Sequence, residues 1–125
     1  MNSYIYTYEQ DVHFFRFVEE SETTFADFMA HVEQVVSSAA ERLRVLADVQ
    51  HKGEEVSILE VLMTIRAIEK RCLHRPAVRV AIVERNEMLL QTIRVVCALI
   101  TRDGDVFRVF LHRDADAAMS WLLEA

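Results

Sequence analysis

The chain has 125 residues, of which 52% are hydrophobic and 27% charged, and this balance is typical of one folded domain and excludes intrinsic disorder. Two glycines and one proline are too few for the many tight turns of a β-sandwich or β-barrel, so helices alternating with strands are favoured. The net charge of −6 argues against nucleic-acid binding, which requires a basic surface.

Two aromatic, β-branched segments at the start of the chain predict a β-hairpin. Residues 3–8 place the tyrosines on one face of a strand, and residues 12–18 show the same period of about two. Only the polar residues 9–11 separate the two segments, and this link is short enough for a hairpin turn.

A long amphipathic helix is predicted next, because apolar residues recur from Phe25 to Leu43 at steps of three and four positions. Thr24 and Asp27 resemble a capping box at its start. A short strand over residues 44–49 then leads into a polar loop.

The rest of the chain alternates between helical and strand patterns. In chain order we expect a helix over residues 56–73, a strand over 78–83, a helix capped by Asn86, a strand over 106–111 and a helix capped by Asp114. Pro76 prevents the first of these helices from continuing, and Gly104 fits the turn before the last strand.

The order of elements is therefore ββαβαβαβα, which predicts an α/β fold with one five-stranded mixed sheet and four helices. Strand–helix–strand steps with short links make parallel neighbours through right-handed crossovers. Packing the helices on one sheet is the simplest way to bury their apolar faces. No repeat, linker or low-complexity stretch interrupts the pattern, so residues 1–125 are expected to form one domain.

Three parts of the sequence carry a resemblance to a known family. The opening hairpin leads into a long helix, and residues 45–49 (Val-Leu-Ala-Asp-Val) look like the family's third strand. The closing segment joins a strand with a Val-Phe pair to a helix that contains Ala117, Ala118, Trp121 and Leu122. In this order the chain resembles the SpoIIAA-like branch of the STAS superfamily of sulfate-transporter and anti-sigma-factor-antagonist domains. The resemblance spans nearly the whole chain and implies a non-enzymatic regulatory or protein-interaction domain.

Classical antagonists of this family carry an Asp-Ser-Ser-Gly motif at the start of the second helix, where a kinase phosphorylates a serine. The matching stretch here, residues 54–58, reads Glu-Glu-Val-Ser-Ile, so Ser57 falls near the phosphoacceptor position, while the second serine and the glycine are absent. The resemblance implies that a protein partner binds here, at Gly53, Glu54, Ser57 and Glu60. Taken alone, Ser57 is typical of a polar residue in the first turn of a helix.

A pocket, where one exists, is expected at the carboxyl ends of the parallel strands. The candidate pocket residues there are Asp48, Glu84, Arg85 and His112. The histidines and cysteines show no spacing that completes a metal site, and the scarcity of glycine removes phosphate-binding loops and the nucleophile elbow of hydrolases. We therefore expect no metal, no cofactor and no catalytic site.

Two alternatives to a regulatory domain stay open. The SpoIIAA-like branch looks related to lipid-binding CRAL-TRIO domains, which implies a carrier with an apolar cavity for a small molecule or lipid. An enzyme that uses Ser57 or a histidine together with a loop carboxylate is the second alternative.

The expected partners are a protein, a second copy of the chain, or a small apolar ligand. Residues 1–62 carry a net charge of −8 and residues 63–125 a net charge of +2, which suits self-association, and the tyrosine-rich opening strand is an expected contact. No nucleic-acid partner is expected, because the chain is acidic. No signal peptide is expected, because the start of the chain has no basic residue and no apolar run, and no membrane span is expected, because charge interrupts every apolar run. Cys72 and Cys97 lie in apolar segments, and two reduced thiols indicate a cytoplasmic protein.

Overall fold

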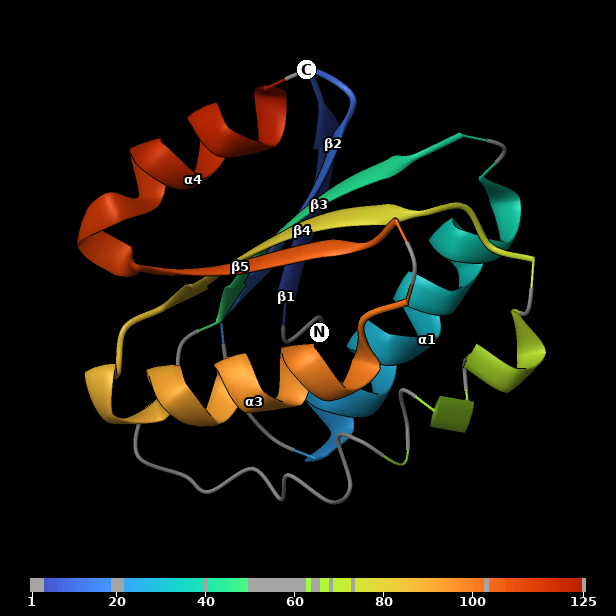
Figure 1. The fold of residues 1–125 in the computed structure, drawn as a ribbon, viewed down its shortest axis with the longest axis horizontal. Helices are drawn as coiled ribbons and strands as arrows, with labels where there is room; N and C mark the ends of the chain where they lie inside the picture. The colour runs from blue at the N-terminus through green and yellow to red at the C-terminus, as the bar shows by residue number, and fades with distance from the viewer. Residues whose placement is uncertain are drawn as a thin grey trace.

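A five-stranded mixed sheet forms the centre of the molecule (Figure 1). The computed structural model describes residues 4–18, 22–39, 41–49, 63, 66–67, 69–72, 74–102 and 104–124. The strands lie side by side in chain order, as β1 (Tyr4–Glu9), β2 (Val12–Phe17), β3 (Leu43–Val49), β4 (Val78–Glu84) and β5 (Val106–Leu111). β1 pairs antiparallel with β2, and each later pair is parallel. β1 and β5 are therefore the two edges of the sheet.

The helices follow the predicted order. They are α1 (Glu22–Ser38), α3 (Leu90–Ile100) and α4 (Ala115–Leu123), with short 3-10 turns η1 (Glu87–Leu89) before α3 and η2 (His112–Asp114) before α4. Residues 63, 66–67 and 69–71 are also helical, within the helix predicted over 56–73, and the rest of that prediction lies outside the described residues. The predicted α/β class, with a five-stranded mixed sheet and four helices, is confirmed.

The predicted helix ends agree with the structure at one position and differ at three. The predicted capping box of Thr24 and Asp27 is wrong, because α1 already begins at Glu22. Asn86 does act as a cap, since its Oδ1 accepts a hydrogen bond from the backbone N–H of Met88. Asp114 makes no capping hydrogen bond with its side chain, because η2 carries the chain into α4 without an extended cap residue. The long helix ends at Ser38 rather than at Leu43, because Leu43 begins the buried strand β3.

The strand order decides which face each helix covers. Successive parallel strands are added on the same side of the previous one, so right-handed crossovers place their connecting helices on one face of the sheet. Figure 1 shows α1 and α3 on that face and α4 alone on the opposite face. The short helix α4 is thus the described element that covers the second face.

The core beneath α4 joins the end of the chain to four strands. Three side chains of α4, those of Ala118, Trp121 and Leu122, are buried there. Their buried partners come from β2 to β5 and are Val12, Leu46, Ala81, Val83 and Phe110. Arg79 of β4 holds the end of the helix, since its Nε and Nη2 donate to the Trp121 carbonyl at 3.1 and 2.8 Å. Its guanidinium also lies 4.1 Å from the centre of the Trp121 ring, in a cation–π contact.

A second core lies on the α1 face. Met29 and Val36 of α1 pack with Leu43, Cys72 and Val78. Cys72 and Cys97 are both buried free thiols. Burial raises the pKa of Cys97 to about 11, so this thiol stays protonated and unreactive at neutral pH.

The turn between β1 and β2 is a two-residue hairpin turn whose two residues both have positive φ angles. Gln10 and Asp11 have φ angles of 53° and 62°, both in the left-handed region. Hairpin turns of this kind favour Asn-Gly, because most other side chains are strained at positive φ. The double substitution Gln10→Asn with Asp11→Gly is therefore expected to stabilise the protein by about 1 kcal/mol. Urea unfolding of the wild type and the double variant measures this, and the slope of the unfolding free energy against urea is expected to stay the same. An unchanged midpoint urea concentration would contradict backbone strain in this turn.

Candidate functional site

The predicted site residues fall into two groups. Gly53, Glu54, Ser57 and Glu60 lie outside the described residues. Asp48, Glu84, Arg85 and His112 are described, and all four lie at or just beyond the carboxyl ends of β3, β4 and β5. The strand ends therefore provide the first candidate site.

The register of β4 and β5 brings two of these residues together. Glu84 and Leu111 are opposite each other, so Arg85 and His112 leave neighbouring strands at the same level. Arg85 Nη2 lies 2.9 Å from His112 Nε2. With Leu111 and Arg113, they line a hollow of about 270 Å³, which we call the strand-end hollow.

Glu84 and Asp48 do not line this hollow. Glu84 is fully buried, and its Oε1 accepts hydrogen bonds from the backbone N–H groups of Arg85 at 2.9 Å and Asn86 at 3.0 Å. It therefore fixes the backbone from which the Arg85 side chain projects. Asp48 is half-buried on β3, and its Oδ1 has no hydrogen-bond partner among the described residues.

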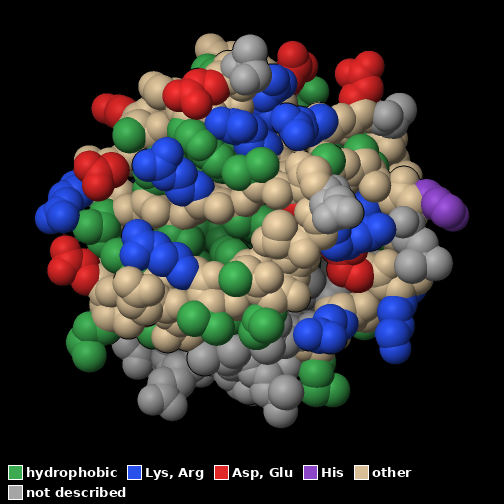
Figure 2. Space-filling model, viewed as in Figure 1, with side chains coloured by type: hydrophobic (Ala, Val, Ile, Leu, Met, Phe, Trp, Pro, Cys, Tyr) green, Lys and Arg blue, Asp and Glu red, His purple; other side chains and the backbone are tan. Residues whose placement is uncertain are grey.

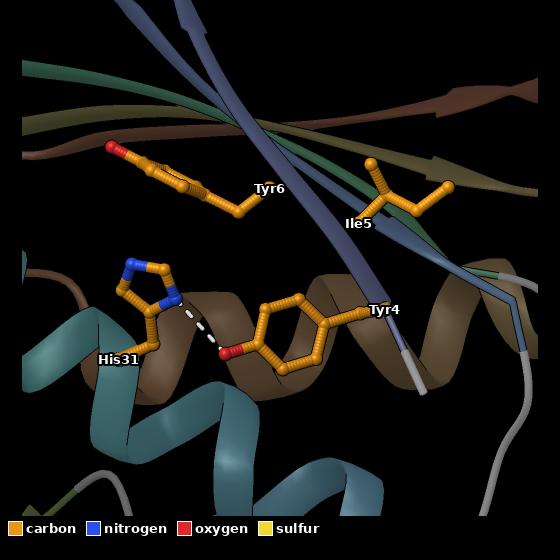
Figure 3. Close-up of a pocket in the computed structure, with 4 residues that line it drawn as sticks. All are labelled: Tyr4, Ile5, Tyr6 and His31. Atoms are coloured by element: carbon orange, nitrogen blue, oxygen red, sulfur yellow. Dashed lines mark hydrogen bonds between the residues drawn. The ribbon is translucent and has the colours of Figure 1, made fainter. Parts of the chain in front are cut away.

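A second hollow, of about 410 Å³, lies between β1 and α1 and was not predicted from the sequence. It is lined by Tyr4, Ile5, Tyr6 and His31, and we call it the tyrosine hollow. Figure 3 shows the rings of Tyr4 and Tyr6 on the same side of β1 as His31 of α1. The Tyr4 hydroxyl lies 2.9 Å from His31 Nδ1, which ties the edge strand to the helix (Figure 3).

Aromatic packing holds the tyrosine hollow in place. The Tyr6 ring centre lies 4.9 Å from that of Phe15 and 4.3 Å from that of His31. Phe15 in turn meets Phe28 of α1 edge-to-face at 5.0 Å. Such geometries are favourable beyond the area they bury. The common face of the tyrosines follows from the alternation in the sequence, but the position of the helix beneath them does not.

The shifted groups of this region are held in their neutral forms. Burial, together with the nearby Asp27 carboxylate, raises the pKa of Tyr4, and burial raises the pKa of Tyr6. Both phenols therefore stay protonated at neutral pH. His13, whose Nδ1 lies 2.7 Å from the Tyr6 hydroxyl, has its pKa lowered by burial and by the nearby His31. The Tyr6 phenol and the His13 imidazole share one hydrogen bond.

No family model, curated protein or solved structure matches this chain. The resemblance to STAS domains therefore stays a prediction from the sequence. Among the described residues, no three His, Cys, Asp or Glu side chains gather as metal ligands. None of the helices in the described part of the chain is both long enough and apolar enough to cross a bilayer.

The lowered pKa of His13 makes stability depend on pH. Below the ordinary histidine pKa the unfolded chain binds more protons at this position than the folded chain, so the free energy of unfolding falls as the pH drops from about 7 to about 5. His13→Gln is expected to reduce this loss, while His74→Gln, at an exposed turn residue, leaves it unchanged. Urea unfolding at several pH values tests this, and equal pH dependence in wild type and His13→Gln would contradict it.

Proposed function

We propose that this chain is a non-enzymatic protein-interaction domain of STAS-like type, and that it binds a second copy of itself along the edge strand β1. The observation that carries the proposal is the unprotected edge. Residues 4–8 of β1 carry no charge and no proline, and Ile5 and Tyr8 are 53% and 55% exposed. Edge strands of folded proteins are normally protected by charge, proline or a bulge, because their free backbone groups pair with other strands.

The opposite edge is protected in the usual way. Arg108 stands exposed in the middle of β5, with its guanidinium 5.0 Å from the centre of the Phe110 ring. Figure 2, viewed with β5 in front, shows Lys and Arg side chains on both sides of an apolar hollow on this face. Pairing β5 with its own copy would bring the Arg108 side chains of the two copies toward one another. The two edges therefore differ, and β1 is the edge suited to pairing.

A two-fold antiparallel pairing of β1 fits its sequence. Centred on Tyr6, it places Tyr6 opposite Tyr6 of the partner subunit and Tyr4 opposite Tyr8 of the partner subunit. Cross-strand aromatic pairs of this kind contribute about 0.2–1 kcal/mol each. The pairing is self-complementary, as a closed dimer requires, and brings no like charges into contact between residues 4 and 8.

The STAS-like assignment adds a regulatory role to this dimer. Its support is the order ββαβαβαβα and the closing strand-and-helix pattern. Contact with a further protein at Gly53, Glu54, Ser57 and Glu60 stays a prediction, since these residues lie outside the described part of the chain.

A matched pair of edge variants tests the proposal. Ile5→Glu and Val106→Glu each place a carboxylate on an exposed edge position whose neighbour in the next strand is an arginine, Arg16 or Arg79. The new charge is therefore tolerated within each monomer. In a β1 dimer of Ile5→Glu, however, the two introduced carboxylates would lie about 7–8 Å apart, as diagonal neighbours do.

Analytical ultracentrifugation and native mass spectrometry are the measurements. We expect a dimer of wild type at about 50 µM, a monomer of Ile5→Glu, and a dimer of Val106→Glu. A wild type that is monomeric at this concentration overturns the proposal, as does equal weakening by both variants. A small molecule retained in the native mass spectrum would favour the carrier alternative instead.

A further inference from the structure

The strand-end hollow is surrounded by hydrogen-bond donors. Its polar lining residues are Arg85 from the end of β4, and His112 and Arg113 from η2. All three side chains are exposed enough to meet a ligand from solvent. The volume of the hollow, about 270 Å³, lies below the range of pockets for drug-sized ligands, about 300–1,000 Å³, so it suits one small group.

The contact between Arg85 and His112 shows which imidazole nitrogen accepts a hydrogen bond. A guanidinium stays protonated and only donates, so His112 Nε2 must accept the hydrogen bond from Arg85 Nη2. In this contact Nδ1 is the ring nitrogen left to donate. That N–H is a further donor, beside the remaining guanidinium N–H groups of Arg85 and Arg113.

The acidic groups near the hollow do not neutralise it tightly. Arg113 Nη1 lies 3.7 Å from Glu87 Oε1, and Arg113 Nε lies 4.0 Å from Asp114 Oδ2. All three of these side chains are exposed, and pairs of this length in water are weak. The buried Glu84 directs its Oε1 to backbone N–H groups. A bound anion would therefore replace the loose contacts that Arg113 makes with Glu87 and Asp114.

We propose that the strand-end hollow binds a phosphoryl group. Two guanidinium groups and one imidazole N–H supply donors from three side chains, and a phosphoryl group offers three acceptor oxygens with close to two negative charges. A carboxylate offers two oxygens and one charge, and matches this set less well. The site is built from β4, β5 and η2, at the opposite edge of the sheet from β1. Phosphoryl binding is therefore expected to be independent of dimer formation through β1.

Phosphate titration followed by nuclear magnetic resonance tests this site. The probe is inorganic phosphate, added at constant pH and ionic strength, with the ring C–H signals of the histidines as the readout. We expect a saturable shift at His112 in wild type, and binding weaker by about tenfold or more in Arg85→Gln and in Arg113→Gln. Arg94→Gln removes an exposed arginine of α3 that does not line the hollow, and is expected to bind like wild type.

Three outcomes would overturn the proposal. Chloride shifting His112 as much as phosphate does would reveal general ionic screening. Unchanged phosphate affinity in both Arg85→Gln and Arg113→Gln would place the anion elsewhere. Acetate binding as tightly as phosphate would assign the hollow to carboxylates rather than to phosphoryl groups. Circular dichroism of each variant establishes that the fold is intact.

Discussion

Asp105→Asn is expected to lower the free energy of unfolding by about 3 kcal/mol, because it removes one member of a buried ion pair. Arg75 and Asp105 form a two-pronged pair, with Nη1–Oδ1 and Nη2–Oδ2 distances of 2.9 and 2.6 Å. Both side chains are almost fully buried. The asparagine is close to the same size, but it leaves the Arg75 charge without this partner in a site of low dielectric.

The carboxylate also organises the backbone around it. Asp105 Oδ1 accepts a hydrogen bond from the N–H of Val78, and Oδ2 accepts one from the N–H of Arg102. Glu69 Oε1 completes the pairing of Arg75 at 2.9 Å. The cluster therefore connects the start of β4 to the turn before β5, where Gly104 has a φ of +88°. Loss of this cluster is expected to loosen both the start of β4 and the turn before β5.

The Arg75–Asp105 pair also makes the free energy of unfolding depend on pH. Burial opposes ionisation of Asp105, but the hydrogen bonds from Arg75 and from two backbone N–H groups outweigh it, and the pKa of Asp105 is lowered. Its contribution to stability is therefore present above the ordinary aspartate pKa of about 4 and is lost as the pH falls below that value. Asp105→Asn is expected to remove this part of the acid dependence.

Urea unfolding at neutral and acidic pH measures both effects. Glu33→Gln is the control, because it breaks the exposed pair of Glu33 with Arg71 and is expected to change stability little. Equal effects of Asp105→Asn and Glu33→Gln at neutral pH would contradict the prediction that the buried pair contributes more to stability than the exposed one.

Leu122→Ala is expected to destabilise the protein by about 3 kcal/mol, since it opens a cavity in the core beneath α4. Leu122 is fully buried, and the surrounding strands are fixed by the sheet, so the space closes only in part. The neighbouring Leu123 is 44% exposed and gives a matched control. Leu123→Ala is expected to cost less than about 1 kcal/mol.

Thermal and urea unfolding of the two leucine variants separate cavity formation from a loss of helix propensity. Both variants replace the same residue type in the same turn of α4, so any propensity effect is shared. Equal destabilisation by Leu122→Ala and Leu123→Ala would mean that α4 is not anchored by Leu122. An intact far-ultraviolet circular dichroism spectrum before unfolding establishes that each variant folds.

The strands were predictable because their patterns are strong and local. Residues 106–111 are predicted as a strand from their apolar and β-branched residues, and β5 has these bounds. The pattern over 78–83 predicts β4 to within one residue. The single face of Tyr4, Tyr6 and Tyr8 likewise follows from a period of two. In each case the neighbouring residues alone decide the conformation.

The contacts that build the sites were not predictable in the same way. Tyr4 meets His31 across 27 positions, and Arg75 meets Asp105 across 30, so both depend on how distant elements dock. Glu84 looked like a polar pocket residue, yet it is buried and holds the backbone of the next loop. Arg85 and His112 did meet, because parallel strands bring their carboxyl ends to one edge.

The chain-order arrangement of the strands has a consequence for biosynthesis. Each new strand from β2 onward finds its partner already made, since its neighbour is the strand that precedes it. The nascent sheet can thus grow at one edge while the ribosome is still translating, because each new strand has to reach only the strand before it in the chain. The face beneath α4, however, stays bare until the last described helix emerges. A chaperone that binds the nascent chain is therefore expected to act on this apolar face, before α4 has been synthesised.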